Sequence, residues 1–323
     1  MSHLTYVEAS IIGLLQGVTE LFPVSSLGHS VLLPAIIGGQ WARDLSVSAK
    51  ESPYLAFIVG LHVATALALV IYFWREWIRI IGGFFTSIRD RRIVTADQRL
   101  AWLIILATIP VGIAGLLLEH AFRVLLGKPI PASLFLATNG VILFAGERLR
   151  RKPSRRADEE VAAEVEAMAA TGRGRHAAGN HALRQQEALD LASDRRLSSI
   201  GYVQAVVIGS AQILALAAGI SRSGVTMVAG LFRGLSHEDA ARFAFLLATP
   251  VILAAGALKI PDLTGRLGNG IHGQILLGSV LSGVGAYLSV RFLTRYFQTR
   301  TLTPFAIYCM VAGVFSFIYL TIR

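Results

Sequence analysis

An apolar stretch near the N-terminus contains side chains whose types and spacing suit catalysis. Gln16 and Glu20 are four residues apart, so they share one face of a helix, which Pro23 is expected to end. Ser26 and His29 are three apart and share a face of the next helix. Ionisable groups in an apolar segment are costly and suggest function. The alternative is a structural polar network that closes helix ends at a hairpin tip.

A second apolar stretch, in the other half of the chain, carries one cation among small residues. The group comprises Gly219, Ser221, Arg222, Ser223 and Gly224. Glycines let backbone N–H groups approach a ligand closely, and a helix N-terminus adds positive potential. The Arg222 guanidinium adds a forked donor that matches phosphate oxygens. The pattern predicts a phosphate site; the alternative is a structural pairing of Arg222 with Glu20.

The composition describes the surroundings of these groups. The chain has 323 residues, of which 54% are hydrophobic and 15% charged, and its mean hydropathy is +0.60. Apolar runs of about 20 residues recur, the length that crosses a bilayer. These features exclude a soluble globular enzyme and a disordered chain. The net charge of +10 is attributed to loops that orient a membrane protein, not to nucleic-acid binding. The single cysteine, Cys309, excludes an internal disulfide.

We expect an all-α multi-pass membrane protein with six full transmembrane helices and two re-entrant helix–loop–helix hairpins. The full spans are Tyr54–Phe73, Leu100–Leu118, Pro131–Gly146, Ala241–Ile260, Ile271–Val290 and Pro304–Ile322. The interrupted segments are Tyr6–Pro34 and Ile200–Leu231. Irregular backbone at membrane depth is tolerated only inside protein or along a cavity, which predicts the hairpins.

Charge predicts the orientation. If both hairpins return to the side they enter from, four connections share one face. They are Trp74–Arg99, Glu147–Ser199, Phe232–Arg242 and Arg291–Thr303. They hold six, eleven, two and three Lys and Arg residues, which is 22 of the 30 in the chain, against seven on the other face. The basic face is expected to be cytoplasmic, with both termini on the other side.

This topology predicts an inverted repeat in a single membrane domain. Residues 1–146 form the first repeat, 147–199 a cytoplasmic linker and 200–323 the second repeat, and each repeat is a hairpin followed by three spans. Such folds place their sites near the midplane, where the interrupted elements meet. The linker is expected to be solvated and partly helical, with the alternative that its basic start binds anionic lipid.

Other polar residues in apolar stretches are given structural roles. His62 is expected to be a satisfied buried histidine, with the alternative that it lines the cavity. Thr65, Asn139 and Gln212 are expected to form hydrogen bonds between helices.

The two motifs together resemble a known family. Gln16–His29 resembles the (Glu/Gln)-x-x-x-Glu…Pro-Val-Ser-Ser-x-Gly-His motif of the bacterial undecaprenyl pyrophosphate phosphatase family, known for bacitracin resistance. Gly219–Gly224 resembles its Pro-Gly-x-Ser-Arg-Ser-Gly motif. Phe73–Arg75 and Gly234–Pro250 also match, so the resemblance covers nearly the whole chain except Glu147–Ser199.

The resemblance implies hydrolysis of undecaprenyl pyrophosphate to undecaprenyl phosphate and inorganic phosphate, which recycles the lipid carrier of cell-wall synthesis. It implies a divalent cation, Mg²⁺ or Ca²⁺, held with the help of Glu20. It also implies a site open to the extracytoplasmic side of the bacterial cytoplasmic membrane, and often a homodimer. The site residues carried over by position are Gln16, Glu20, Ser25, Ser26, His29, Ser221, Arg222 and, more peripherally, Thr226.

The chain departs from the family pattern at a few positions. Ala218 replaces the usual Pro, Ile220 the common Thr, and Leu27 a position that is frequently small and polar. His62 stands where Gln is expected. No departure removes a charged or nucleophilic group, so they bear on loop rigidity and substrate affinity.

Several mechanisms are compatible with these residues. Arg222 and the backbone amides of Ser221–Gly224 would hold the terminal phosphate, while Glu20 would hold the metal or orient the attacking group. Ser26 is a candidate nucleophile with His29 as its base, and attack by His29 or by water is the alternative. A different class, a flippase for undecaprenyl phosphate or an anion transporter, would need the binding groups but no nucleophile.

Overall fold

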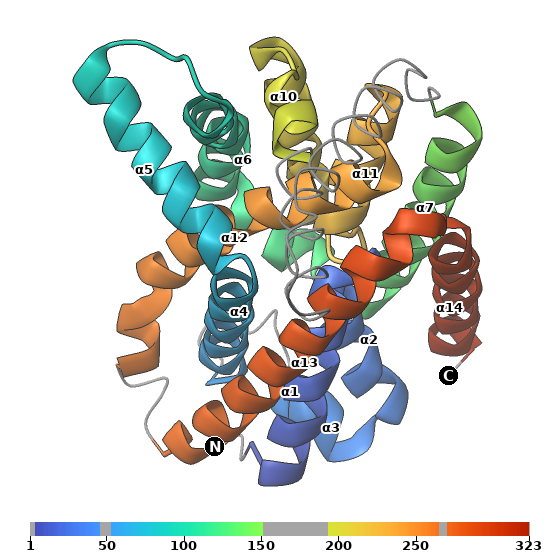
Figure 1. Cartoon of the computed structure of the whole chain (residues 1–323). Coiled ribbons are helices and arrows are strands. Elements are labelled where there is room, and N and C mark those ends of the chain that lie inside the picture. The colour runs from blue at the N-terminus through green and yellow to red at the C-terminus, as the bar shows by residue number, and fades with distance from the viewer. Residues whose placement is uncertain (1–3, 46–52, 151–192, 265–269, 323) are drawn as a thin grey trace, which may run out of the picture.

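The computed structural model describes residues 4–45, 53–150, 193–264 and 270–322, and all regular elements in these ranges are helices (Figure 1). The linker interpretation, which concerned mostly residues 151–192, lies outside them. The helices are α1 (Tyr6–Leu21), α2 (Ser26–Ile37), α3 (Gly39–Asp44), α4 (Pro53–Tyr72), α5 (Trp74–Asp90), α6 (Ala96–Leu126), α7 (Pro129–Leu149), α10 (Tyr202–Ser210), the 3₁₀ turn η1 (Ala211–Leu216), α11 (Arg222–Phe232), α12 (His237–Thr264), α13 (His272–Thr299) and α14 (Thr303–Ile322).

Five helices in the described ranges are long and apolar enough to cross a membrane: α6, α7, α12, α13 and α14. They account for five of the six predicted spans, of which one begins a residue before its helix, at Ile271, so the chain is a multi-pass membrane protein. The sixth prediction, Tyr54–Phe73, coincides with α4, which qualifies only when it is taken together with α5.

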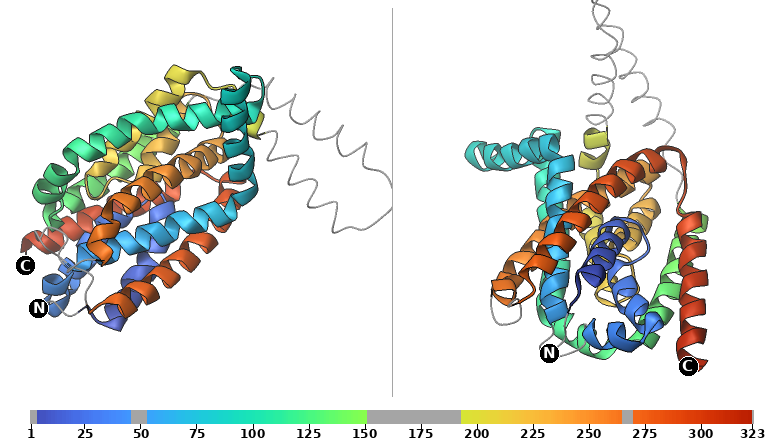
Figure 2. Two further views of the ribbon diagram at one scale, coloured as in Figure 1. Left: turned by 90° about the vertical axis from the view of Figure 1, so that its left-hand side faces the viewer. Right: turned by 90° about the horizontal axis from the view of Figure 1, so that it is seen from below.

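The segment after α4 differs from the prediction. Trp74–Arg99 was expected to be a loop-like connection, but its first 17 residues form α5, which turns by 85° from α4. One face of α5 is apolar and exposed, with Ile78, Ile81 and Phe85 on it. Figure 2 shows α5 lying across one end of the bundle, while both termini lie at the other end. An amphipathic helix in this position is typical of a membrane–water interface.

Each interrupted segment contains a turn followed by a capped helix. Pro23 follows α1, and α2 begins after Ser25, whose hydroxyl accepts a hydrogen bond from Gly28 N. In the second segment α10 and η1 lead to α11, which begins after Ser221, whose hydroxyl accepts from Gly224 N. Serine caps therefore start the inner helix of both segments, as side-chain oxygens at the N-cap commonly do.

The helices pack in matched pairs. In Figure 1, α7 lies beside α14 and α4 beside α12; α1 packs on α13, as α10 packs on α6. Two glycines permit the closest approaches, since a Cβ at Gly17 or at Gly209 would collide with the backbone of the helix opposite, at Ser282 or Ala107 respectively. This packing holds α1, α2 and α11 together in the middle of the bundle, where the side chains singled out from the sequence lie.

Candidate active site

The turns of the two interrupted segments touch. A Cβ added to Gly28 would lie 2.8 Å from the Cα of Gly219, so glycine permits this contact. The Ser25 hydroxyl accepts hydrogen bonds from both Gly28 N and Gly219 N, each at 3.2 Å. Ser25 adopts a φ of +69°, which a non-glycine residue keeps only when its surroundings hold it there. Through these hydrogen bonds Ser25 links the two turns.

Asn139 of α7 reinforces this junction. Its Nδ2 donates to the Pro23 carbonyl at 3.0 Å, and its Oδ1 accepts from Ser221 N at 3.0 Å. The hydroxyls of Ser221 and Ser223 lie 3.1 Å apart, and the Ser223 hydroxyl donates to the Phe22 carbonyl at 3.3 Å. The predicted interhelical hydrogen bonds of Asn139 are confirmed, and they join the two turns.

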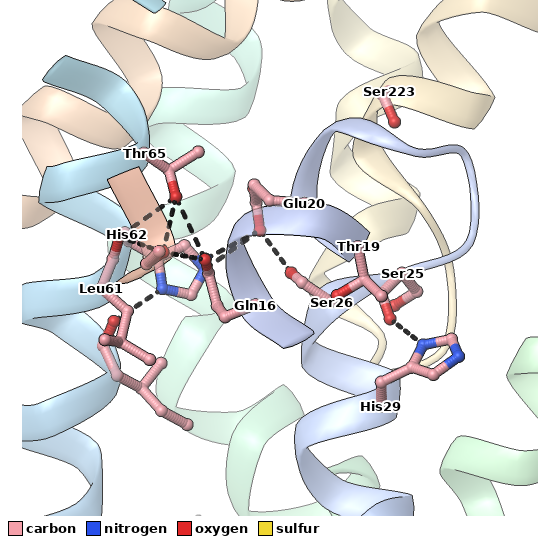
Figure 3. A network of polar contacts seen from close by, with 12 residues as sticks. Gln16, Thr19, Glu20, Ser25, Ser26, His29, Leu61, His62, Thr65 and Ser223 are labelled. Carbon is pink, nitrogen blue, oxygen red and sulfur yellow. Dashed lines mark hydrogen bonds and ion pairs between the residues drawn. The ribbon is translucent and has the colours of Figure 1, made fainter. Parts of the chain in front are cut away.

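Glu20 is the centre of a buried polar cluster (Figure 3). Its Oε2 accepts a short hydrogen bond from the Ser26 hydroxyl. The same oxygen lies 3.4 Å from Gln16 Nε2 and 3.3 Å from His62 Nε2 of α4. A carboxylate that accepts a hydrogen bond from a serine hydroxyl can take its proton, which is the arrangement that activates a nucleophile.

Gln16 is held in place by its own neighbours. Its Oε1 accepts hydrogen bonds from Thr65 at 3.1 Å and from Ser282 of α13 at 2.8 Å. The carbonyl end of the amide is therefore engaged, which directs the NH₂ group toward Glu20. The hydrogen bonding predicted for Thr65 is confirmed.

His29 does not contact Ser26. Its Nδ1 lies 2.7 Å from the Ser25 carbonyl and its Nε2 lies 2.8 Å from the Tyr308 hydroxyl of α14. Figure 3 shows its ring on the opposite side of α2 from Glu20. The Ser25 carbonyl, four residues earlier at the start of α2, holds the imidazole. The expected Ser26–His29 pair is thus absent from this structure, and Glu20 takes the place of the base.

Arg222 is the first residue of α11 and is half-buried. Its Nη1 is buried and has no hydrogen-bond partner among the residues that the structure describes. Its charge acts on Glu20 and His62. Thr226 donates to the Arg222 carbonyl one helical turn back, at 2.7 Å, so its hydroxyl is used within α11. The Arg222 guanidinium therefore offers an unused N–H donor at a helix N-terminus, an arrangement that suits the binding of an anion.

The structure thus brings most of the predicted residues to one place and separates a few. Gln16, Glu20 and Ser26 form the cluster, and Arg222 acts on it from the second segment. Ser25, Gly219, Ser221, Ser223 and Gly224 build the junction between the turns, His29 faces α14, and Thr226 bonds within its helix.

Some residues were underestimated by the sequence analysis. His62 was given a structural role, but it contacts Glu20 directly, and its place in the middle of an apolar helix was the available signal. Tyr308, 279 residues from His29, gave no sequence signal. Gln212 was expected to bond between helices, yet neither of its side-chain amide atoms has a partner among the described residues, and nothing in the structure explains it.

The side chains around Glu20 show whether the site suits the divalent cation that the resemblance to the family implies. Among the described residues no group of three His, Cys, Asp or Glu side chains is arranged so that it could hold a metal ion. Glu20 is the carboxylate of the cluster, with Gln16, Ser26 and His62 beside it. Magnesium in phosphate sites is commonly held by one or two carboxylates together with substrate oxygens. These residues therefore fit a cation that arrives with a phosphorylated substrate.

Comparison with known proteins gives a consistent result. A family described as Bacitracin resistance protein BacA matches residues 9–315. The chain is 62% identical to a protein named undecaprenyl-diphosphatase from Mycolicibacterium paratuberculosis, over 100% of this chain and 99% of that protein. It is 56% identical to undecaprenyl-diphosphatase 2 of Frankia alni, over 97% of both chains. It is 39% identical to undecaprenyl-diphosphatase 2 of Chromobacterium violaceum, over 97% of this chain and 98% of that one.

Proposed function

Since the chain belongs to the Bacitracin resistance protein BacA family, we propose that it hydrolyses undecaprenyl diphosphate to undecaprenyl phosphate and inorganic phosphate. Relatives that match the full chain carry the name of this phosphatase. The observation that assigns this reaction to particular residues is the hydrogen bond from the Ser26 hydroxyl to Glu20. Nearby, the buried Nη1 of Arg222 has no hydrogen-bond partner among the described residues.

Arg222 binds the terminal phosphate. Its buried Nη1 is free for a phosphate oxygen, and the N-terminus of α11 adds its dipole. Phosphoryl transfer depends mainly on positioning and on stabilising the charge of the phosphoryl oxygens. A fixed guanidinium supplies both, because its fork matches phosphate geometry.

Ser26 is the nucleophile and Glu20 its base. The Ser26 oxygen attacks the terminal phosphorus, its proton passes to Glu20 Oε2, and the bond to the bridging oxygen breaks. Undecaprenyl phosphate leaves with the electrons of that bond. Water then hydrolyses the phosphoserine and releases inorganic phosphate. The alternative is direct attack by a water molecule that loses its proton to Glu20.

A divalent cation, Mg²⁺ or Ca²⁺, would be held by Glu20 and by the substrate, and it would neutralise charge on the diphosphate. Gln16 keeps the carboxylate in place through its amide. His29, held by the Ser25 carbonyl and by Tyr308, shapes the turn that carries Ser26.

The two interrupted segments act as re-entrant hairpins in an inverted repeat. The support is the equivalent packing of α1 on α13 and of α10 on α6, together with the touching glycines of the two turns. We place the protein in the bacterial cytoplasmic membrane with the connections that hold 22 of the 30 basic residues on the cytoplasmic side. The resemblance to the family implies that the site opens to the other side. The homodimer remains part of the proposal by resemblance to the family.

Release of phosphate from undecaprenyl diphosphate by the purified protein in detergent tests this function. Wild type with Mg²⁺ or Ca²⁺ is expected to release phosphate and Ser26→Ala is not, while Ser10→Ala, at the partly exposed start of α1, serves as the matched control. Detergent has no second compartment, so release distinguishes a phosphatase from a flippase. A folded wild type that releases no phosphate would overturn the proposal.

A further inference from the structure

Helix α5 exposes an apolar stripe along its whole length. The stripe consists of Trp74, Ile78, Ile81, Phe85 and Ile88, which are three or four residues apart and therefore lie on one face of the helix. Each of these side chains is at least half exposed. A continuous row of large apolar side chains is unusual in contact with water, so another apolar surface is expected to cover it.

The opposite face of α5 is packed against the bundle. A Cβ at Gly83 would lie 2.8 Å from the backbone of Asp97 in α6, so the two helices touch there. Glu76, one heptad before Gly83 and on the same face, forms an ion pair with Arg242 of α12 at 2.8 Å. These contacts fix α5 to the bundle and leave the stripe turned away from it.

The path of the chain favours the membrane as the covering surface. Helix α4 is an apolar helix of 20 residues, and α5 leaves its end at an angle of 85°. If α4 crosses the bilayer, α5 runs roughly parallel to the membrane plane, at the end of the bundle opposite the two termini (Figure 2). An apolar stripe at this level can enter the boundary between headgroups and acyl chains, as in interfacial helices.

A basic edge lies beside the stripe. Arg75 and Arg89 each follow a residue of the stripe by one position, so both lie on the same side of it. Two further arginines, Arg91 and Arg92, follow the last turn of α5, and all four are exposed. Asp90, paired with Arg89 at 2.8 Å, is the exposed acid of this segment. The edge therefore keeps a net positive charge, which complements an anionic surface.

We propose that α5 binds anionic phospholipid at the membrane surface, with the stripe among the acyl chains and the basic edge on the headgroup phosphates. The guanidinium fork of arginine matches phosphate oxygens. The edge has room for headgroups, since a Cβ at Gly82, midway between Arg75 and Arg89, would have no atom within 4 Å. Each basic residue near an anionic surface strengthens binding by about fivefold. The proposal does not depend on the phosphatase function.

The test uses the full-length protein in nanodiscs of equal parts phosphatidylglycerol and phosphatidylcholine, with a bimane fluorophore on Ile81→Cys in the stripe. Bromine on the acyl chains of one lipid at a time quenches a fluorophore that lies beside that lipid. We expect little quenching by aqueous iodide, and brominated phosphatidylglycerol to be about fivefold more effective than brominated phosphatidylcholine.

Two controls belong to this measurement. Val314→Cys on α14, whose native side chain is as exposed as that of Ile81, should be quenched equally by the two brominated lipids. Wild type should take up no fluorophore, because its single cysteine, Cys309, is buried.

Removing the charges of the edge tests the role of the arginines. The combined variant Arg75→Gln, Arg89→Gln, Arg91→Gln and Arg92→Gln should lose the preference for phosphatidylglycerol. The matched control changes four other exposed arginines, at the ends of α11 and α13, and should keep it: Arg233→Gln, Arg291→Gln, Arg295→Gln and Arg300→Gln. High salt should also lower the preference, a check that requires no change to the arginines.

Three results would overturn the proposal. Quenching by iodide and not by brominated lipid would show that the stripe faces water and is a surface for a protein. Equal quenching by the two lipids, before any arginine is changed, would show that the headgroup charge is not recognised. An equal loss of preference in the two sets of arginine variants would assign the effect to the overall charge of the protein and not to the edge of α5.

Discussion

Two buried polar clusters in this molecule differ in how their charges are satisfied. The Glu20 cluster consists of Gln16, Glu20, Ser26, His62 and Arg222. The ion-pair cluster consists of Glu76, Arg79, Asp194, Arg196, Asp239 and Arg242. Both bury charged groups, but the second joins α5 and α12 to the helical turn at residues 193–198.

In the ion-pair cluster, every charge has an opposite charge close by. Arg242 lies 2.8 Å from both Glu76 and Asp194, and Arg79 lies 2.6 Å from Asp194. Arg196 forms a two-pronged contact with Asp239 at 2.7 and 2.9 Å. A buried charge is tolerable when it is paired in this way, and such a set holds helices in register.

The Glu20 cluster lacks this balance of opposite charges. Among the described residues Arg222 forms no ion pair, and its buried Nη1 has no hydrogen-bond partner. Buried charge alone therefore does not identify a site; a buried cation without an opposite charge in contact does. The predictions below test this contrast, since substitutions in the first cluster should affect catalysis and those in the second should affect stability.

The largest effect is expected at Glu20 and Ser26. Glu20→Gln and Ser26→Ala should each lower kcat by about 10³-fold or more, because one removes the proton acceptor and the other the nucleophile. Phosphate release under saturating substrate measures this. Either variant turning over at the wild-type rate would remove Ser26 and Glu20 from the reaction.

Arg222→Ala is expected to lower kcat/KM by roughly 10²–10³-fold, because the guanidinium that stabilises the transferred phosphoryl group is lost. The matched control is Arg233→Ala, which removes an exposed arginine at the other end of α11. Equal losses in the two variants would indicate a general effect of charge on α11.

Asn139→Leu should have a smaller effect of about tenfold on kcat. Apart from a contact of its Nδ2 with Cys309 Sγ at 3.4 Å, the side chain bonds backbone groups of the two turns, so its loss loosens their relative position and leaves the reacting groups present. Thr138→Val, an exposed neighbour on α7, is the control. An unchanged kcat would show that the hydrogen bonds from Asn139 are not needed to hold the two turns in their relative position.

The smallest effect on turnover is expected in the ion-pair cluster. Arg242→Met should leave the kcat of folded protein within about twofold but destabilise it by about 3 kcal/mol, because Glu76 and Asp194 lose a buried partner. Thermal unfolding in detergent measures the loss. If Arg242→Met had normal stability and little activity, the ion-pair cluster would serve catalysis and not stability, contrary to this expectation.

The sequence was informative where one physical signal dominates. Long apolar runs predicted α6, α7, α12, α13 and α14, since their composition leaves few alternatives to spanning a membrane. Polar groups within apolar stretches predicted Glu20, Ser26 and Arg222 as the residues to examine. These inferences use local sequence only.

The remainder depends on packing between distant segments. That His62 faces Glu20 follows from how α4 packs beside α1, and that His29 meets Tyr308 follows from the position of α14. The absence of α5 from the prediction has a different cause: its arginines were counted as loop charges, although Ile78, Ile81, Phe85 and Ile88 recur at helical spacing.

On the proposed mechanism, Glu20 of the first interrupted segment and Arg222 of the second belong to one site. The most direct measurement is kcat/KM for phosphate release by Glu20→Gln, Arg222→Ala and the double variant, beside wild type. Because the two residues act on the same phosphoryl group, the double variant should be no more than about tenfold worse than the worse single variant. Effects that multiply fully would contradict a shared site and place Glu20 and Arg222 in separate roles.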